Sequence, residues 1–219
     1  MTWRIEQTDA LTLLRELPSD WVQTCIAYPP CGATTTRTLA MLSEIRRLLR
    51  KDGTLWLFLP NEAMRCELHD AGWLDQRPPS WAGRVRLLAA GVRPMALLTK
   101  GPAYFHRLAS ISPRAPREFR PRRIGWHVPR VEQGHEAIRA LAGRCVLTTT
   151  AQVACGTCGA PFRRLYGGEQ LSACAHHNPV GRCLVLDPWY SPARGTFDAA
   201  HHNGRTFLGI VDSRDGEPQ

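Results

Sequence analysis

Residues 183–211 constrain the fold of this chain more than any other stretch. The apolar run 183–186 is typical of a fully buried strand, and the apolar run 206–211 is typical of a second one. Between them the pattern predicts a short helix over 197–203. Strand, helix and strand in this order form a βαβ unit, in which the turn after the first strand lies at the carboxyl edge of the sheet. The sequence therefore predicts an α/β fold with a candidate ligand site beside Asp187.

The turn after Asp187 has residue types that suit a sharp connection into a helix. Pro188 and Gly195 favour a tight turn. Thr196 is predicted to cap the helix, because a threonine hydroxyl can accept a hydrogen bond from the first helical turn. The Asn-Gly pair at 203–204 is expected to end it.

The rest of the chain alternates strand and helix patterns. Strands are expected at 1–7, 21–27, 54–59 and 95–100, with shortened ones within 73–92, and helices at 10–16, 33–50, 62–71 and 136–147. Asp9 is predicted to cap the first helix, and Asp52-Gly53 to stop the second. Together with the βαβ unit, these elements predict a doubly wound sheet in a single domain over residues 1–219.

The net charge of +9 favours a polyanionic partner such as nucleic acid. Nearly all of the positive charge is arginine, since lysine occurs only at Lys51 and Lys100. Arginine suits phosphate and guanine recognition, although a GC-rich genome would give the same bias. No stretch is long and apolar enough to span a bilayer, and the first ten residues do not have the pattern of a signal peptide. We therefore expect a cytoplasmic protein.

A basic linker, residues 113–130, interrupts the α/β pattern. Its prolines argue against a helix, so the segment is expected to be an extended or mobile loop. Arginine side chains in it could lie along a nucleic-acid backbone; the candidates are Arg117, Arg120, Arg122 and Arg123. The alternative is a solvated loop whose charge has no specific partner.

Four residues in the C-terminal half have the spacing of a metal site. Cys155 and Cys158 are two thiols separated by two residues, and each is followed by a glycine. Fifteen residues separate Cys158 from Cys174, and His176 follows two places later. Three thiolates and one imidazole form a closed tetrahedral zinc site of the structural kind.

The sequence leaves the fourth zinc ligand open among His176, His177 and Cys183. The main rival is a redox Cys-x-x-Cys pair, but that would leave Cys174 and His176 without a role. We therefore expect a zinc knuckle that stabilises a short insertion, residues 154–178, and takes no part in catalysis.

The C-terminal βαβ unit resembles the cofactor-binding motif of the DNA amino-methyltransferases, which methylate N6 of adenine or N4 of cytosine. The family has DPF-x-G-S-G-T, then a helix, then G-R-x-F-x-G-I-E. This chain has DPW at 187–189, GT at 195–196 and GRTFLGI at 204–210. The intervening turn, 190–194, is about two residues longer than the family's and lacks its first glycine.

A second motif, YPP at 28–30, lies where the family has its catalytic tetrapeptide, [DS]PPY. In such a motif an oxygen acceptor orients the amine of a flipped base, and an aromatic ring stacks on the base. Here Tyr28 stands at the first position and Cys31 at the fourth. Where the family has an acid after Gly-Ile, this chain has Val211, and its acid, Asp212, comes one place later.

The resemblance spans nearly the whole chain and implies a Rossmann-like, doubly wound methyltransferase sheet, permuted so that the catalytic-type motif comes first. It implies S-adenosylmethionine as cofactor, facing Asp187, Trp189, Gly195 and Thr196. It also implies DNA as partner, with the target base facing Tyr28, Pro29 and Pro30.

Three functions are compatible with these motifs. The first is a DNA methyltransferase for adenine N6 or cytosine N4. The second is a catalytically inactive DNA-binding or partner subunit with the same fold. The third is a methyltransferase for another substrate, with Tyr28 and Cys31 reshaping the pocket.

Overall fold

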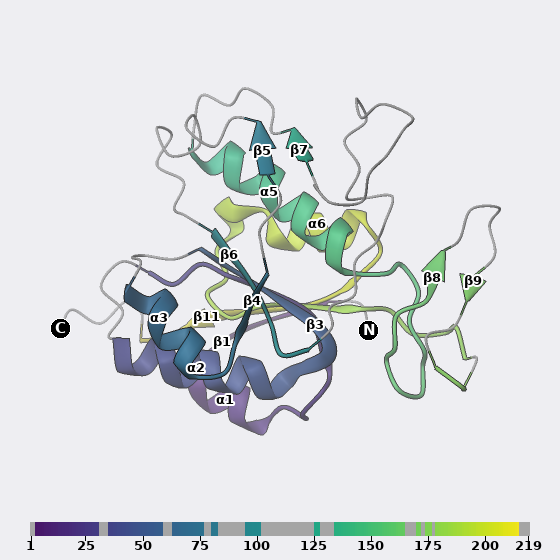
Figure 1. The fold of residues 1–219 in the computed structure, drawn as a ribbon, viewed down its shortest axis with the longest axis horizontal. Helices are drawn as coiled ribbons and strands as arrows, with labels where there is room; N and C mark the ends of the chain where they lie inside the picture. Colours follow the sequence, from purple (N-terminus) through teal and green to yellow (C-terminus); the bar gives the residue numbers. More distant parts are fainter. Residues whose placement is uncertain are drawn as a thin grey trace.

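A seven-stranded sheet forms the centre of the molecule (Figure 1). The computed structural model describes residues 3–30, 35–58, 63–76, 80–82, 95–101, 125–127, 134–164, 170–171, 174–176 and 178–214. The strands, in their order across the sheet, are β1 (Trp3–Thr8), β11 (Thr206–Asp212), β10 (Leu184–Asp187), β2 (Val22–Ala27), β3 (Leu49–Phe58), β6 (Met95–Thr99) and β4 (Leu74–Gln76). Neighbouring strands are parallel except where they pair with β6.

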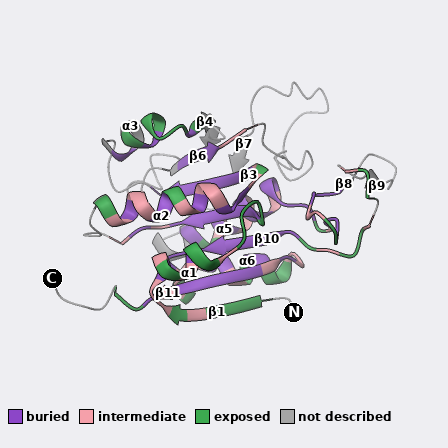
Figure 2. Cartoon of the chain, turned by 90° about the horizontal axis from the view of Figure 1, so that it is seen from below, coloured by how far each residue is buried: buried purple, intermediate pink, exposed green. Residues whose placement is uncertain are grey.

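Helices cover both faces of this sheet, which confirms the predicted α/β fold (Figure 1). One face carries α1 (Ala10–Glu16), α2 (Thr35–Leu48) and α3 (Ala63–Asp70), and the other carries α5 (Gly134–Thr149) and α6 (Thr196–His202). Leu14 and Ile45 are fully buried on the first face, and Leu141 and Val146 on the second. Figure 2 shows the central strand β10 as buried, whereas the edge strand β1 is largely exposed, and β2 beside β10 is buried along its whole length. No helix in the described part of the chain is long and apolar enough to cross a membrane.

The order of the strands creates a switch point between β10 and β2. These two strands are parallel neighbours, with Leu186 opposite Cys25. From β10 the chain passes through α6 to β11 on one side, and from β2 it passes through α2 to β3 on the other side. Because the two crossovers leave in opposite directions and cover opposite faces, the carboxyl ends of these two strands are the place where open α/β folds bind ligands.

The predicted cap of α1 is confirmed, but the predicted cap of α6 is wrong. Asp9 accepts a hydrogen bond from the Thr12 backbone N–H at 2.7 Å. In α6 the capping residue is Gly195, in the left-handed region at φ 69°, and Thr196 is already helical. The reason lies in the turn before it, because a 3₁₀ helix, η1 (Pro192–Arg194), leads directly into Gly195.

The predicted stop of α2 at Asp52-Gly53 is also wrong, since α2 ends at Leu48 and β3 begins at Leu49. Pairing with β2 explains the difference. Val22 pairs with Leu49 and Thr24 pairs with Thr54, so β3 carries extra residues that bulge within the strand. Gly53 lies in this bulge, where a Cβ atom would come within 3.1 Å of the Gln23 carbonyl oxygen.

Short strands extend the fold beyond the main sheet. In the described residues, β5 (Ser80–Ala82) pairs with β7 (Gly125–His127), and β8 (Arg163–Arg164) pairs with β9 (Gln170–Leu171). The strand β7 is the described part of the basic linker. The candidate phosphate contacts of that linker lie outside the described residues: Arg117, Arg120, Arg122 and Arg123.

Candidate functional site

The two motifs singled out in the sequence meet at the carboxyl edge of the sheet. Asp187 ends β10, and Tyr28 follows the neighbouring strand β2. The side chain of Arg194 crosses from one motif to the other, and its Nη1 donates to the Tyr28 carbonyl oxygen at 3.1 Å. Its guanidinium carbon lies 4.5 Å from the centre of the Tyr28 ring. Segments separated by 166 positions therefore form one site.

Asp187 is the buried acid of this site, with only 1% of its surface exposed. Burial disfavours the charged carboxylate and raises its pKa from 3.8 to about 6. The charge of Arg194, the Thr196 hydroxyl and the Trp189 backbone N–H act in the opposite direction. The Trp189 N–H donates to Oδ1 of Asp187 at 3.2 Å. The Thr196 hydroxyl is thus tied to the acid instead of capping its helix.

Tyr28 is half-buried where the chain leaves β2. Its ring contacts Phe58 at the end of β3, with 5.1 Å between the ring centres. Pro29 is buried beside it, and Pro30 is partly exposed. Cys31, the last residue of the tetrapeptide, lies outside the described residues. The structure thus brings Tyr28, which Pro29 and Pro30 follow, next to the turn after Asp187.

Trp189 and Gly195 have structural reasons for their positions in that turn. Trp189 is 4% exposed, and its side chain belongs to the apolar core that α1 and α2 share with the sheet. Gly195 has φ 69°, and a Cβ atom there would come within 2.6 Å of Cγ of Arg139 on α5. Only glycine meets both requirements, so the close packing of α5 against the turn depends on this residue.

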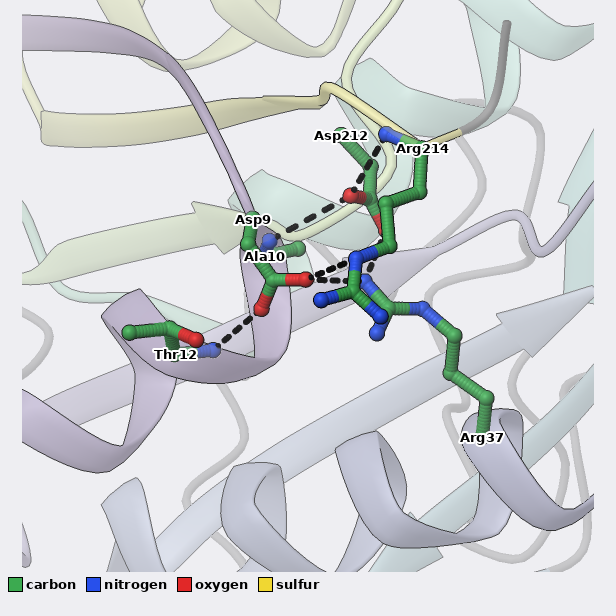
Figure 3. Close-up of polar contacts among 6 residues, drawn as sticks. All are labelled: Asp9, Ala10, Thr12, Arg37, Asp212 and Arg214. Carbon is green, nitrogen blue, oxygen red and sulfur yellow. Dashed lines mark hydrogen bonds and ion pairs between the residues drawn. The ribbon is translucent and has the colours of Figure 1, made fainter. Parts of the chain in front are cut away.

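A cluster of ion pairs lies further along the same edge, where β1 and β11 end (Figure 3). Asp212 is buried, and its Oδ2 pairs with Nη2 of Arg37 on α2 at 2.7 Å. The same guanidinium pairs with Asp9 at 3.2 Å, and Nε of Arg214 approaches Asp9 at 2.7 Å. The Ala10 backbone N–H donates to Asp212 at 3.4 Å.

These contacts stabilise the charged form of Asp9. Partial burial would raise its pKa, but hydrogen bonds from Thr12 and the charges of Arg37 and Arg214 outweigh it and lower the pKa from 3.8 to about 2. The carboxylate of Asp212, the acid found one place late in the sequence, therefore holds β11, α1 and α2 together.

The predicted zinc ligands come together in the structure. The ligand atoms of Cys155, Cys158, Cys174 and His176 all lie within 4.8 Å of one another. Cys183 lies elsewhere, 2% exposed and packed against Ala151 and Ala154, and burial raises its thiol pKa to about 11. His177 lies outside the described residues. Of the three candidates for the fourth ligand, the structure brings His176 to the thiols.

The loop around Cys155 has the backbone geometry that a thiolate site needs. The Gly159 N–H donates to the Cys155 carbonyl at 2.7 Å, with Gly159 in the left-handed region at φ 68°. Backbone N–H groups of Thr157 and Cys158 point to the Cys155 sulfur, and that of Ala160 points to the Cys158 sulfur. These four ligand groups and the backbone N–H groups around the sulfurs fit a tetrahedral zinc ion.

The metal cluster lies at the opposite end of the sheet from Asp187. It precedes β10, whereas Asp187 ends that strand, and Figure 1 shows β8 and β9 beyond the end of the sheet opposite the C-terminus. Arg50, near the start of β3, donates to the Cys158 carbonyl oxygen. The cluster is therefore placed to hold the insertion onto the sheet.

Arg194 and Arg37 are the two residues of this edge that sequence reasoning missed. Arg37 pairs with a residue 175 positions away, and nothing in its local pattern indicates that contact. Arg194 did leave a signal, because it lies in the turn that is longer than the family pattern.

Comparisons with known proteins agree with this architecture. No protein-family model matches the chain, and no curated protein matches it in sequence. Solved structures do match. TTHA0409 from Thermus thermophilus, assigned as a DNA modification methylase and solved with S-adenosyl-L-methionine, has a TM-score of 0.57 at 20% identity, over 94% of this chain and 86% of that one.

Two further structures cover almost the whole chain. M1.HpyAVI, solved as a complex with SAM, gives a TM-score of 0.54 at 15% identity, over 97% of this chain and 94% of that one. The cytosine-N4-specific PvuII DNA methyltransferase gives a TM-score of 0.53 at 10% identity, over 96% of this chain and 82% of that one. The chain therefore has the fold of DNA modification methylases, as its motifs predict.

Proposed function

We propose that this protein is an S-adenosylmethionine-dependent DNA amino-methyltransferase, acting on adenine N6 or cytosine N4. The observation that supports this most directly is the meeting of the two motifs at the switch point of the sheet, where Arg194 bridges to Tyr28. The similar structures agree, since their names include a cytosine-N4-specific methyltransferase and complexes with S-adenosylmethionine.

In this proposal each motif has one task. The turn after β10 binds the cofactor: Asp187, Gly195 and Thr196 face it, and Trp189, buried in the core, holds the turn in place. The segment after β2 orients the amine of a flipped base; its residues are Tyr28, Pro29 and Pro30. S-adenosylmethionine supplies the methyl group, and the chain brings donor and acceptor together.

Acids that are buried at a cost to folding stability are common at functional sites. Asp187 is 1% exposed and its pKa is raised to about 6, so the folded protein is destabilised by keeping this carboxylate charged at neutral pH. A ligand that donates hydrogen bonds to the carboxylate would offset that cost. We propose that the cofactor is this ligand.

The remaining predicted sites have supporting roles in the proposal. A zinc ion held by Cys155, Cys158, Cys174 and His176 would stabilise the insertion. The arginines of the basic linker would contact phosphates of the DNA: Arg117, Arg120, Arg122 and Arg123.

A second candidate function is a non-catalytic DNA-binding or partner subunit with this fold. Two observations favour it. Tyr28 stands where the family has an acid or serine. In addition, its backbone carbonyl and its ring are both engaged by Arg194.

The test is calorimetric titration of the zinc-loaded protein with S-adenosylmethionine, with Asp187→Ala as the control variant. Binding that the substitution abolishes would support the methyltransferase and justify assays of methyl transfer to DNA. A folded protein that binds no cofactor would refute it and leave the non-catalytic subunit.

The DNA contact is tested separately by binding to duplex DNA at several salt concentrations. Replacing Arg120, Arg122 and Arg123 by alanine should weaken binding and reduce its salt dependence. Unchanged affinity at every salt concentration would contradict the proposed phosphate contacts.

A further inference from the structure

The edge strand β1 leaves one side of the main sheet open. Among the described strands it pairs with β11 alone, and it forms the outer border of the sheet (Figure 2). Two of its apolar side chains are exposed, Trp3 by 52% and Ile5 by 40%. An open edge with exposed apolar side chains is a template for a further strand, because its unpaired backbone groups can extend the sheet. The strand β1 is therefore a candidate interaction surface.

The backbone of β1 presents alternate residues to this open side. The Thr8 carbonyl oxygen accepts a hydrogen bond from the Ser213 N–H at 3.0 Å, so it points toward β11. Backbone groups of successive residues in a strand point to opposite sides, and those of Arg4 and Glu6 therefore point toward β11 as well. The residues whose N–H and C=O groups point away from the sheet are Trp3, Ile5 and Gln7.

The side chains of β1 differ between the two faces of the sheet. The Trp3 ring lies on the side of α6, with its centre 5.6 Å from that of Phe197, and Ile5, two places later, has the same orientation. Arg4 and Glu6 lie on the other face, where they form an exposed ion pair with each other. One face of this edge is thus apolar, and the other carries one cation and one anion.

We propose that two copies of this protein pair through β1, antiparallel about a two-fold axis at Ile5, so that their sheets become continuous. In this arrangement Ile5 exchanges both of its backbone hydrogen bonds with Ile5 of the partner subunit. Trp3 does the same with Gln7 of the partner subunit. Every outward-pointing residue of β1 then has a backbone partner, and the exposed apolar side chains of the two copies meet on the α6 face.

The charges on the opposite face select this register. With the axis at Ile5, Arg4 lies opposite Glu6 of the partner subunit, and Glu6 lies opposite Arg4 of the partner subunit. Together with the ion pair inside each copy, the four charges alternate in sign. An axis moved to Arg4 or to Glu6 would place two like charges directly opposite each other, which is unfavourable. The edge is therefore complementary to itself in one register.

This pairing leaves the candidate functional sites apart. The strands β1, β11 and β10 are parallel to one another, and Asp187 ends β10. Because the two copies of β1 run in opposite directions, their carboxyl ends lie at opposite edges of the continuous sheet. The two Asp187 turns are then at opposite edges as well, and the inference does not depend on the proposed function.

The experiment is sedimentation velocity of the zinc-loaded protein at a series of concentrations. We expect a reversible dimer with a dissociation constant of about 10–300 µM, because a single strand pair is small for a specific interface. Arg4→Glu and Glu6→Arg should each weaken the dimer at least about tenfold, because like charges then face each other twice. Lys51→Glu is the matched control, since it makes the same change of charge at an exposed position of β3 and should leave the dissociation constant unchanged.

Mixing the two charge-reversed variants tests the register itself. An equimolar mixture of Arg4→Glu and Glu6→Arg should dimerise although neither variant does so alone, because the two acidic positions of one variant face the two basic positions of the other. Amide hydrogen exchange provides a second readout: at high concentration, protection should increase at Trp3, Ile5 and Gln7. A monomeric unmodified protein, a dimer that withstands both reversals, or a mixture of folded variants that stays monomeric would overturn the inference.

Discussion

Replacing Asp187 by asparagine should make the protein more stable at neutral pH. The folded pKa of about 6 lies above the ordinary value of 3.8, because burial disfavours the charged form. The Asp187 carboxyl group therefore does not reduce the free energy of unfolding below pH 3.8, reduces it progressively between pH 3.8 and about 6, and reduces it by the full amount above that. The difference between the two pKa values corresponds to about 3 kcal/mol.

Asparagine removes the charge but keeps an oxygen that can accept the Trp189 N–H, now donated at 3.2 Å. We expect Asp187→Asn to raise the free energy of unfolding by up to about 3 kcal/mol at about pH 7.5. At about pH 3.5 the free energy of unfolding should be unchanged. The measurement is urea unfolding of both proteins at matched pH values. Because both proteins carry the same knuckle, any loss of metal at low pH cancels in the comparison.

Asp198→Asn on α6 provides the control for this measurement. The Asp198 side chain is 51% exposed and pairs with Arg139 at 3.6 Å, so its loss should change stability by less than about 0.5 kcal/mol at any pH. An Asp187→Asn protein that is less stable than the original at neutral pH would refute the reasoning. So would a gain in stability that does not depend on pH.

Three further perturbations test other parts of the structure. Arg37→Ala removes the partner that pairs with the buried Asp212 carboxylate at 2.7 Å, and it should lower the free energy of unfolding in urea by about 2 kcal/mol. Arg37→Lys should recover part of that loss. A loss under about 0.5 kcal/mol in Arg37→Ala would contradict this. Gly195→Ala and Gly204→Ala should each lower the free energy of unfolding by about 1–2 kcal/mol, because alanine is strained in the left-handed backbone region. Gly195→Ala should lower it clearly further, because only there would the new Cβ atom overlap Arg139, at 2.6 Å. Equal losses in the two variants would refute the packing argument. Elemental analysis should find about one zinc ion per chain, lost in Cys174→Ser but retained in Cys183→Ser; zinc retained in the first variant would exclude the proposed ligand set.

Most of the local structure could be predicted from the sequence, because short-range rules govern it. Helix α1 begins and ends where its pattern predicts, with Asp9 as its cap. The spacing of the three thiols was enough to group them, but it left His176 as one of three candidates for the fourth ligand. Where sequence reasoning failed, long-range pairing decided the outcome: the register between Val22 and Leu49 set the boundary of α2 and β3. No local pattern encodes that register.

The candidate site shows the same division between short-range and long-range effects. Asp187 and Tyr28 could be identified as motif residues one at a time. That they lie at one edge of the sheet depends on β10 pairing with β2, which the chain order alone does not reveal. The bridge that Arg194 makes to Tyr28 depends in turn on that pairing and on the longer turn.

The metal cluster lies where the chain enters β10, and Asp187 lies where the same strand ends. Backbone hydrogen bonds join Ala154 to Gly181 in both directions, and Arg50 ties the Cys158 carbonyl to the start of β3. The cluster therefore fixes the point at which the chain enters β10, and this strand is only four residues long, Leu184–Asp187. A shift of one residue at the entry would turn every side chain of the strand to the opposite face of the sheet. On this argument we expect a zinc ion in the cluster, though remote from Asp187, to help fix the register of β10 with β2 and β11 that presents this acid at the carboxyl edge of the sheet.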